Sequence, residues 1–492
     1  MTTPTKPTSN PNKYHHIAII GAGPAGITAV KCLREAGLEV TAYEKSADIG
    51  GLWHYDEDAP DGGGIAYRSL KTNTSKKMTA FSDFPFPEEA DDYPHRTEVL
   101  AYLNRYADHF GIRPFIRLNT TVEHITLQDD QKWLVTYQTE GRTTQNELFD
   151  AVVVASGFYQ KPLIPHLPGL DDFKGNILHS ADYKGPEPFV GRCVVVIGSG
   201  SSGADVAGEV GQRAEQVDLS SRTPVWFVPH FANGKPLDNN ITRFSNHLPN
   251  QLRKSYFEKT VLNSYQRMGL TDETIDSVLA LPEYDPESTK TIPGTKILQA
   301  AANGRVRVKG DIQKVEPDGV RYTDGSQTKA DTLIFCTGYA PALPYLDPSV
   351  IRVQDTNTFG LYKLVFHPQL DNLAFLAQCR VGGPVFPVME MQARWAAAVF
   401  TGTAELPPPA VRQKVIQAHF AACQEKGKNP MQVLYADYMN EIAGEIGVRP
   451  KWLAHLDLLK KLLFNPILPA QFRLDGPGKS DKAREIIENY RP

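Results

Sequence analysis

A strand–loop–helix pattern that occurs twice in the 492 residues constrains the fold of this chain more than any other feature. In the first copy, the apolar run HIAII at 16–20 leads into Gly21, Gly23 and Gly26, and a helical pattern follows. A second apolar run then ends at Glu44, 23 residues after the first glycine. Glycines at this spacing allow a tight turn and bring a pyrophosphate close to a helix N-terminus, and the acid can accept from ribose hydroxyls. The segment therefore predicts a dinucleotide site that does not take a 2′-phosphate.

The second copy has the same glycine spacing but a different end. The apolar run VVVI leads into Gly198, Gly200 and Gly203, and the strand after the helix ends at Ser221 and Arg222. No acid stands there, and the guanidinium offers a planar fork to a 2′-phosphate. This copy therefore predicts an NADP site. Together the two copies indicate a flavoprotein in which FAD occupies the first site, while NADPH docks on the second and delivers hydride.

Two further buried runs mark the passages between these units. Each ends in a turn of small residues, Ala155-Ser156-Gly157 in one case and Cys336-Thr337-Gly338 in the other. We expect an α/β fold with two Rossmann-like dinucleotide-binding domains, the second inserted into the first. The expected parts are a disordered tail at 1–15, an FAD-binding domain at 16–170 and 333–492, and an NADPH-binding domain at 171–332 with an insertion at about 223–295.

Composition and missing motifs exclude several classes of function. The net charge of −4 gives no reason to expect a nucleic-acid partner. The five cysteines form no CxxC pair, which argues against a disulfide framework, a zinc site and a dithiol redox centre, and favours a reducing, cytoplasmic compartment. No secretory signal and no run of about 18 apolar residues is present, so we expect no membrane span. GxSxG and HExxH are absent, so we expect a cofactor to carry the chemistry and no metal.

Several motifs resemble the class B flavin-containing monooxygenases, most closely the microsomal dimethylaniline monooxygenase type. GGLW at 50–53 follows the first acid, and YRSLKTNTSKKMTAFSDFPFP at 67–87 matches a family run. FKGNILHSADY at 173–183 fits the fingerprint FxGxxxHxxx(F/Y). LYKLVFHP, MQARWAAAVF and FRLDGPGKSDKAREII extend the likeness, so that it covers roughly 470 residues.

The resemblance implies a reaction. NADPH reduces FAD, NADP⁺ stays bound, and O₂ adds to the flavin to give a C4a-hydroperoxide that oxygenates a soft nucleophile, an amine nitrogen or a sulfide sulfur. Two alternatives stay open: a Baeyer–Villiger enzyme acting on ketones, whose fingerprint usually ends in Trp rather than Tyr183, and a non-oxygenating NADPH-binding flavoprotein that senses redox state.

The resemblance also bears on partners. The hydrophobic C-terminal anchor of the microsomal relatives is missing, which indicates a soluble member. The amphipathic stretch 455–469 leaves peripheral membrane contact open, although a helix packed on the flavin domain is favoured. A homodimer is also left open.

Asn73 is the candidate catalytic residue. The family places this asparagine beside the flavin C4a region and the nicotinamide, where an amide can both donate and accept. By motif position, Gln392 would hydrogen-bond the flavin ring, Trp53 and Leu52 would line the FAD, and Val122 would lie near the adenine. In the fingerprint, the two aromatic residues would pack, the glycine would permit a turn, and the histidine would fix the linker between domains by hydrogen bonding.

Besides Asn73, the candidate residues fall into three groups. The FAD group consists of Gly21, Gly23, Pro24, Ala25, Gly26, Glu44, Lys45, Gly51, Leu52, Trp53, Val122 and Gln392. The NADP group consists of Gly198, Gly200, Ser201, Ser202, Gly203, Ser221, Arg222 and Thr337. The hinge group consists of Phe173, Gly175, His179 and Tyr183.

Overall fold

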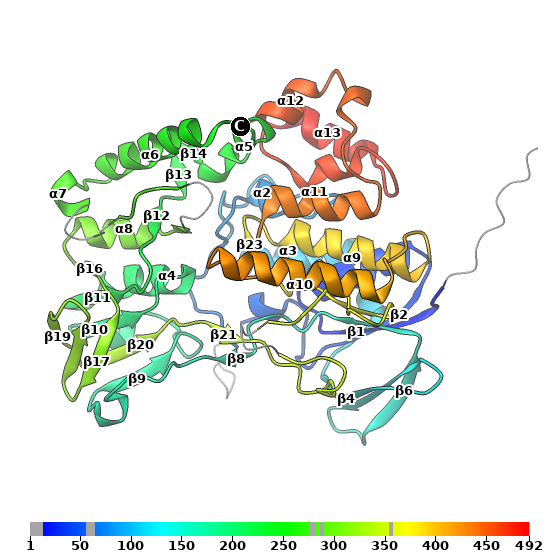
Figure 1. Ribbon diagram of the computed structural model, residues 1–492, viewed down its shortest axis with the longest axis horizontal. Coiled ribbons are helices and arrows are strands. Elements are labelled where there is room, and N and C mark those ends of the chain that lie inside the picture. Colours follow the sequence, from blue (N-terminus) through cyan, green and yellow to red (C-terminus); the bar gives the residue numbers. More distant parts are fainter. Residues whose placement is uncertain are drawn as a thin grey trace, which may run out of the picture.

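The computed structural model describes residues 13–55, 64–275, 279, 281–285, 290–353 and 358–491. Two five-stranded parallel sheets organise the chain, and each is covered on both faces (Figure 1). The sequence-predicted tail lies outside the described residues except for 13–15.

The first sheet has the strand order β22-β7-β1-β2-β3, and all of its pairs are parallel. The strands are β1 (His16–Ile20), β2 (Glu39–Tyr43), β3 (Ile116–Arg117), β7 (Ala151–Val154) and β22 (Leu373–Phe375). Strands covered on both faces read as continuous apolar runs, which explains sequences such as HIAII and AVVV.

Helices cover one face of this sheet, and a small antiparallel sheet covers the other (Figure 1). The helical layer contains α1 (Pro24–Glu35), α3 (Arg96–His109), α9 (Phe386–Phe400), α10 (Pro409–Glu425) and α11 (Tyr435–Glu445). The small sheet contains β4 (Thr120–Leu127), β5 (Trp133–Thr139) and β6 (Gln145–Phe149). Ile17 and Ile19 pack on the helical side, whereas Ala18 and Ile20 pack on the small sheet.

The second sheet has the order β16-β11-β10-β20-β9, again entirely parallel. Its strands are β9 (Asn176–His179), β10 (Cys193–Ile197), β11 (Gln216–Ser220), β16 (Val306–Lys309) and β20 (Thr332–Phe335). The elements packed on its faces are α4 (Ser201–Val210), α8 (Thr295–Ala302), β17 (Ile312–Glu316), β18 (Gly319–Tyr322) and β19 (Gln327–Lys329).

The order of strands along the chain establishes the topology. All strands of the second sheet come from 176–335, and β22 then returns to the first sheet. The prediction of one Rossmann-like unit inserted into another is therefore confirmed. The two connecting segments pair with each other through β8 (Lys161–Pro162) and β21 (Tyr339–Ala340), between the two lobes in Figure 1. The exact residue boundaries of the two domains stay predictions.

The segment predicted as an insertion adds a layer above the second sheet. It contains β12 (Trp226–Val228), β13 (Phe231–Ala232), β14 (Lys235–Pro236), α5 (Arg243–Asn246), α6 (Asn250–Arg267), α7 (Asp272–Thr274) and β15 (Thr291–Pro293). Its helix α5 reaches the C-terminal region, where Phe244 contacts Phe464.

The remaining elements are short. They are α2 (Lys76–Thr79), β23 (Arg380–Gly382), β24 (Gln432–Leu434), α12 (Leu459–Phe464) and α13 (Asp481–Asn489). None of the helices in the described ranges combines the length and the apolar character that crossing a membrane requires. All five cysteines are free thiols.

Candidate functional site

The first glycine loop joins β1 to α1 with no room for side chains. Gly21 has a left-handed φ of 102°. A Cβ atom on Gly26 would lie 1.9 Å from the Gly21 carbonyl oxygen, so the first turn of α1 packs directly on the loop. A Cβ on Gly23 would come within 3.5 Å of a Cα in the 3₁₀ turn η1 (Gly51–Trp53), which places that turn beside the loop. The N-terminus of α1 can therefore offer its N–H groups to a pyrophosphate.

Hydrophobic residues complete the wall beside this loop. Trp53 is buried and meets Phe386 edge-on, with ring centroids 6.2 Å apart, and Leu52 is half-buried. Pro24 and Ala25 open α1 and are buried. Apolar walls with few polar groups are typical of cofactor sites.

Glu44 directly follows β2, and its carboxylate is buried against the loop. One oxygen accepts from the Ala22 N–H at 2.8 Å and the other from the Ser46 N–H at 2.9 Å. Each oxygen keeps a lone pair, so the geometry is compatible with a ribose hydroxyl. The next residue, Lys45, lines a surface pocket of about 520 Å³. The other lining residues are Asn119, Thr121, Gln138, Glu140 and Gly141. Val122 on β4 does not line this pocket and packs half-buried against the core between the first sheet and the small antiparallel sheet.

Gln392 is fully buried on α9, and its amide already has protein partners. The side-chain oxygen accepts from the Ala377 N–H at 2.9 Å, and the side-chain nitrogen donates to the Tyr438 hydroxyl at 2.9 Å. These bonds hold Ala377 in a left-handed conformation (φ 61°). A hydrogen bond from Gln392 to the flavin would require this amide to exchange a partner, and it stays a prediction.

The neighbouring Gln378, which sequence reasoning missed, offers an unused polar group. It follows β22 in the chain and is buried, its amide nitrogen lies 3.5 Å from the Gly157 carbonyl oxygen, and its amide oxygen has no partner among the described residues. A buried acceptor without a donor is costly, so a bound group with an N–H at this edge of the first sheet would fit. No motif marks Gln378, because its environment comes from β7, far away in the sequence.

The second loop repeats the geometry of the first and leaves an approach open. Gly198 has φ 108°, and a Cβ on Gly203 would lie 1.8 Å from the Gly198 carbonyl oxygen. In contrast, a Cβ on Gly200 would meet nothing within 4 Å. Ser201 and Ser202, both half-buried, begin α4 beside this space. The loop therefore has the two properties that a pyrophosphate needs, a helix N-terminus and an unobstructed backbone.

The end of β11 presents one fixed and one free polar group. The Ser221 hydroxyl donates to Ser199 Oγ at 2.6 Å and approaches the Thr223 carbonyl oxygen at 2.7 Å. Arg222 is exposed, and the described part of the chain supplies no hydrogen bond or ion pair to its guanidinium. Arg222 is therefore available to an anionic ligand.

His179 joins the two segments that connect the domains. Its Nδ1 accepts from the Ala181 N–H at 3.1 Å, so the other nitrogen carries the proton and donates to the Gly338 carbonyl oxygen at 3.1 Å. Burial lowers the pKa of His179, which favours this neutral form. Thr337, next to Gly338, donates to the Leu163 carbonyl oxygen at 2.5 Å, so Thr337 also ties the two connecting segments together.

The other fingerprint residues pack as expected, with one difference. Phe173 is buried, and Tyr183 is buried with its hydroxyl donating to Glu209 Oε2 at 3.0 Å. Gly175 does not have a left-handed φ. It is required for space, because a Cβ there would lie 2.4 Å from the Asp331 carbonyl oxygen and 2.6 Å from the Phe173 ring. The glycine therefore permits the connecting segment to lie against β20 rather than permitting a turn.

Asn73 lies in an irregular stretch before α2. Its side chain is exposed, and the described residues give it no hydrogen-bond partner. Its backbone neighbours are fixed, since the Thr72 N–H donates to the Pro94 carbonyl oxygen at 3.0 Å and the Ser75 N–H donates to Asp238 Oδ2 at 2.6 Å. Because the backbone on both sides is fixed by hydrogen bonds and the side-chain amide has no protein partner, Asn73 is suited to contact a ligand.

The comparisons with known proteins agree with these two nucleotide loops. A family model described as flavin-binding monooxygenase-like matches residues 14–490. The chain belongs to this family. Flavin-containing monooxygenase 5 of Oryctolagus cuniculus is 35% identical over 495 residues, which cover 96% of this chain and 91% of the relative. Dimethylaniline monooxygenase (N-oxide-forming) 2 of Cavia porcellus is 34% identical, with 96% and 90% covered.

Solved structures of flavin monooxygenases share the fold. An S-allyl-L-cysteine S-oxygenase from Allium sativum superposes with a TM-score of 0.69 at 25% identity, over 96% of this chain and 99% of that one. A cyclohexanone monooxygenase with ε-caprolactone bound gives 0.62 at 20% identity, over 87% and 97%. OTEMO, solved with FAD and NADP, gives 0.60 at 19% identity, over 84% and 91%.

The chain is therefore an oxidoreductase of the flavin-binding monooxygenase type. Its two glycine loops have the shape that a bound dinucleotide requires. Side chains at Gly26 and Gly203 are excluded because the helix packs on the loop, and the space beside Gly200 is free for a ligand. Among the described residues, no group of three or more His, Cys, Asp or Glu side chains is arranged to hold a metal ion.

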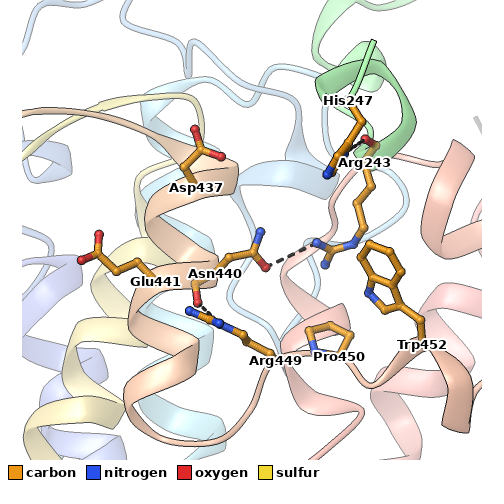
Figure 2. Close-up of a pocket in the computed structure, with 8 residues that line it drawn as sticks. All are labelled: Arg243, His247, Asp437, Asn440, Glu441, Arg449, Pro450 and Trp452. Atoms are coloured by element: carbon orange, nitrogen blue, oxygen red, sulfur yellow. Dashed lines mark hydrogen bonds between the residues drawn. The ribbon is translucent and has the colours of Figure 1, made fainter.

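A separate pocket of about 440 Å³ lies between α5, α11 and the stretch 449–452 (Figure 2). Arg243 in its wall is only 4% exposed. The guanidinium donates to Gln471 Oε1 at 3.0 Å and to Asn440 Oδ1 at 3.4 Å, and its Nε has no partner. Within the described ranges no carboxylate forms an ion pair with it, and burial lowers its pKa. Among the described residues, the contacts of the cation are therefore two neutral amides and the rings of Trp452 and Phe472.

Asn440→Asp is expected to stabilise the protein by supplying the missing anion. The substitution keeps the shape of the side chain and converts a neutral contact into a charge-assisted one, worth about 1–2 kcal/mol where the pair is partly screened. The folded pKa of the new carboxyl would be lowered by Arg243, so the gain is present above its unfolded pKa of about 3.9 and is lost as the pH falls through the folded value. Urea unfolding at pH 7 and at low pH measures the gain. Equal stability of variant and parent at pH 7 would contradict the expectation.

Proposed function

We propose that this flavin monooxygenase transfers one oxygen atom of O₂ to a soft nucleophile, an amine nitrogen or a sulfide sulfur. The observation that carries the proposal is the likeness to an N-oxide-forming dimethylaniline monooxygenase over 96% of the chain. The S-oxygenase from Allium sativum, which shares the fold over nearly the whole chain, supports it. The cyclohexanone monooxygenase, at 20% identity, bears on the fold alone.

The protein's part in this reaction is binding and shielding. Reduced FAD supplies the oxygen activation and NADPH supplies the hydride. The N-termini of α1 and α4 would hold the two pyrophosphates, and Glu44 would accept from the adenosine ribose of FAD. The amide of Asn73 would donate and accept hydrogen bonds at the reacting centre, and the apolar wall around Trp53 would exclude water.

A product assay tests the proposal. The FAD-loaded enzyme receives NADPH and O₂ together with N,N-dimethylaniline, methyl phenyl sulfide or cyclohexanone, and the oxygenated product and H₂O₂ are measured per NADPH consumed. We expect the N-oxide and the sulfoxide to form. Lactone from cyclohexanone alone would favour the Baeyer–Villiger alternative. One H₂O₂ formed for each NADPH consumed, with no oxygenated product, would favour the non-oxygenating flavoprotein.

Arg222→Ala is expected to remove the preference for NADPH over NADH. The guanidinium is exposed beyond β11, where the ribose of a nucleotide on the second loop would lie, and no carboxylate of the described residues forms an ion pair with it. A lost charge-assisted contact of about 2–3 kcal/mol lowers kcat/KM for NADPH about 30- to 160-fold and leaves the value for NADH unchanged. Stopped-flow flavin reduction with both nucleotides gives the two values. An equal loss for both nucleotides would assign Arg222 a structural role.

The sequence leaves both a peripheral membrane contact and a homodimer open. Sedimentation of the protein with and without lipid vesicles would measure both.

A further inference from the structure

Residues 67–75, called the Asn73 segment below, lie between the two domains and have no helix of their own. On one side, two backbone hydrogen bonds join the segment to the first domain, one from the Thr72 N–H to the Pro94 carbonyl oxygen and one from the Arg96 N–H to the Leu70 carbonyl oxygen. These bonds use backbone atoms, so the side chains at the start of the segment are available for contacts with the second domain.

On its other side, the Asn73 segment is bonded to α4, the helix that follows the second glycine loop. The Tyr67 hydroxyl donates to Asp205 Oδ2 at 2.5 Å, and the Ser69 hydroxyl donates to Glu209 Oε2 at 2.9 Å. The two carboxylates are four residues apart and so lie on one face of α4. That face is turned to the Asn73 segment, while the N-terminus of the same helix begins at the second glycine loop, where a nucleotide would bind.

Glu209 is itself held by two further groups. The Tyr183 hydroxyl donates to the same oxygen at 3.0 Å, and Lys296 Nζ lies 3.9 Å from the other oxygen. Lys296 also donates to Ser69 Oγ at 3.0 Å. Glu209, Ser69 and Lys296 thus form a closed set of contacts in which a shift of one member disturbs the others.

Close packing of α8 on α4 brings Lys296 to this place. A Cβ on Gly208 would lie only 2.4 Å from the Ile297 backbone nitrogen, so the two helices touch at their backbones. Because the two helices are in such close contact, a shift of α4 is passed on to Lys296 and to the carboxylates bonded around it.

Tyr67 matters most to the contact because the described chain gives Asp205 no other hydrogen-bond donor. Tyr67 is buried, and its ring meets the Tyr183 ring with centroids 5.8 Å apart. Burial raises the pKa of Asp205 above its usual range while the Tyr67 hydrogen bond opposes that shift. Removing the hydroxyl alone would leave the ring packing intact and Asp205 without its donor.

The far end of the Asn73 segment is held from the inserted part of the chain. The Ser75 N–H donates to Asp238 Oδ2 at 2.6 Å, and Asp238 follows β14. Contacts from the nucleotide-binding side therefore reach the segment on both sides of Asn73.

We propose that Asp205 and Glu209 are positioning residues that couple nucleotide binding at α4 to the placement of Asn73, through Tyr67 and Ser69. A nucleotide that orders the first turns of α4 also orders the two carboxylates, and these fix the start of the Asn73 segment. Such coupling requires only that the nucleotide binds better to the ordered arrangement. The proposal rests on the proposed function for the role of Asn73, but the coupling itself is independent of any turnover.

Hydrogen–deuterium exchange of the FAD-loaded full chain tests the coupling without substrate or NADPH. Exchange of the backbone amides at 70–79 is followed with and without NADP⁺, at a saturating concentration set by titration for each variant. In the parent we expect NADP⁺ to slow this exchange about tenfold, a size typical of coupling between sites. Tyr67→Phe should lose most of that slowing and keep its FAD content. Tyr322→Phe is the matched control, because this buried hydroxyl donates to Asp218 Oδ2 at 3.2 Å in the same domain but away from the Asn73 segment.

Full NADP⁺-dependent slowing in Tyr67→Phe would overturn the proposal, as would the absence of any slowing in the parent. Glu209→Gln gives a second test that keeps the shape of the side chain, and the same loss is expected there. The ratio of H₂O₂ to oxygenated product per NADPH should rise several-fold in both variants and not in the control. If the parent makes no oxygenated product but shows the NADP⁺ effect at 70–79, the proposed function fails and the coupling stands.

Discussion

Gly26→Ala is expected to yield a protein that no longer retains FAD. The new methyl group would lie 1.9 Å from the Gly21 carbonyl oxygen, which is backbone and cannot rotate away. Either α1 moves off β1 or the loop changes shape, at a cost of about 1–3 kcal/mol or more, and both changes move the N–H groups away from the pyrophosphate. The ratio of flavin to protein absorbance after purification should fall at least about tenfold, and the midpoint of thermal unfolding should fall with it.

Gly200→Ala is the matched control, because it adds the same methyl group to the other glycine loop. A Cβ at this position meets nothing within 4 Å, so the protein should fold and keep its FAD. The methyl group would instead occupy the space that the second loop leaves open, and the KM for NADPH should rise. Normal FAD retention in Gly26→Ala, or loss of FAD in Gly200→Ala, would contradict the assignment of the two loops.

The fold could be predicted from the sequence because its decisive signals are local. Each glycine loop sits within about 30 residues that contain a strand, a helix and the next strand, and backbone sterics fix that unit without reference to the rest of the chain. The second small-residue turn predicts that the chain returns to the first domain after it, although no sequence signal marks β22 itself. Such turns occur where parallel strands meet ligands at their carboxyl ends.

The partners of individual side chains could not be predicted in the same way. Tyr67 and Asp205 are 138 residues apart, and no spacing rule connects them. The motif position of Gln392 suggested a contact with the flavin, but its bonds to Ala377 and Tyr438 depend on how α9 and α11 pack. The requirement for space at Gly175 arises from a carbonyl oxygen on another strand. These features follow from tertiary packing, which a single sequence does not reveal.

Asn73→Leu is expected to separate NADPH consumption from oxygenation. The side chain has no partner among the described residues, and its segment is held by the backbone bonds of Thr72 and Ser75, so the substitution should leave folding and FAD content unchanged. The apolar side chain can neither donate nor accept at the reacting centre. NADPH oxidation should continue, while oxygenated product per NADPH falls at least about tenfold and H₂O₂ accounts for the difference.

Asn303→Leu serves as the control for replacing an exposed asparagine by leucine, since this residue caps α8 away from both glycine loops. Its product yield should equal that of the parent. An unchanged yield in Asn73→Leu would remove Asn73 from the reacting centre. The Tyr67→Phe result would then still report on the segment, because it depends on backbone exchange and not on the amide. The two variants together therefore distinguish an asparagine that acts through its side chain from a segment that matters only for its position.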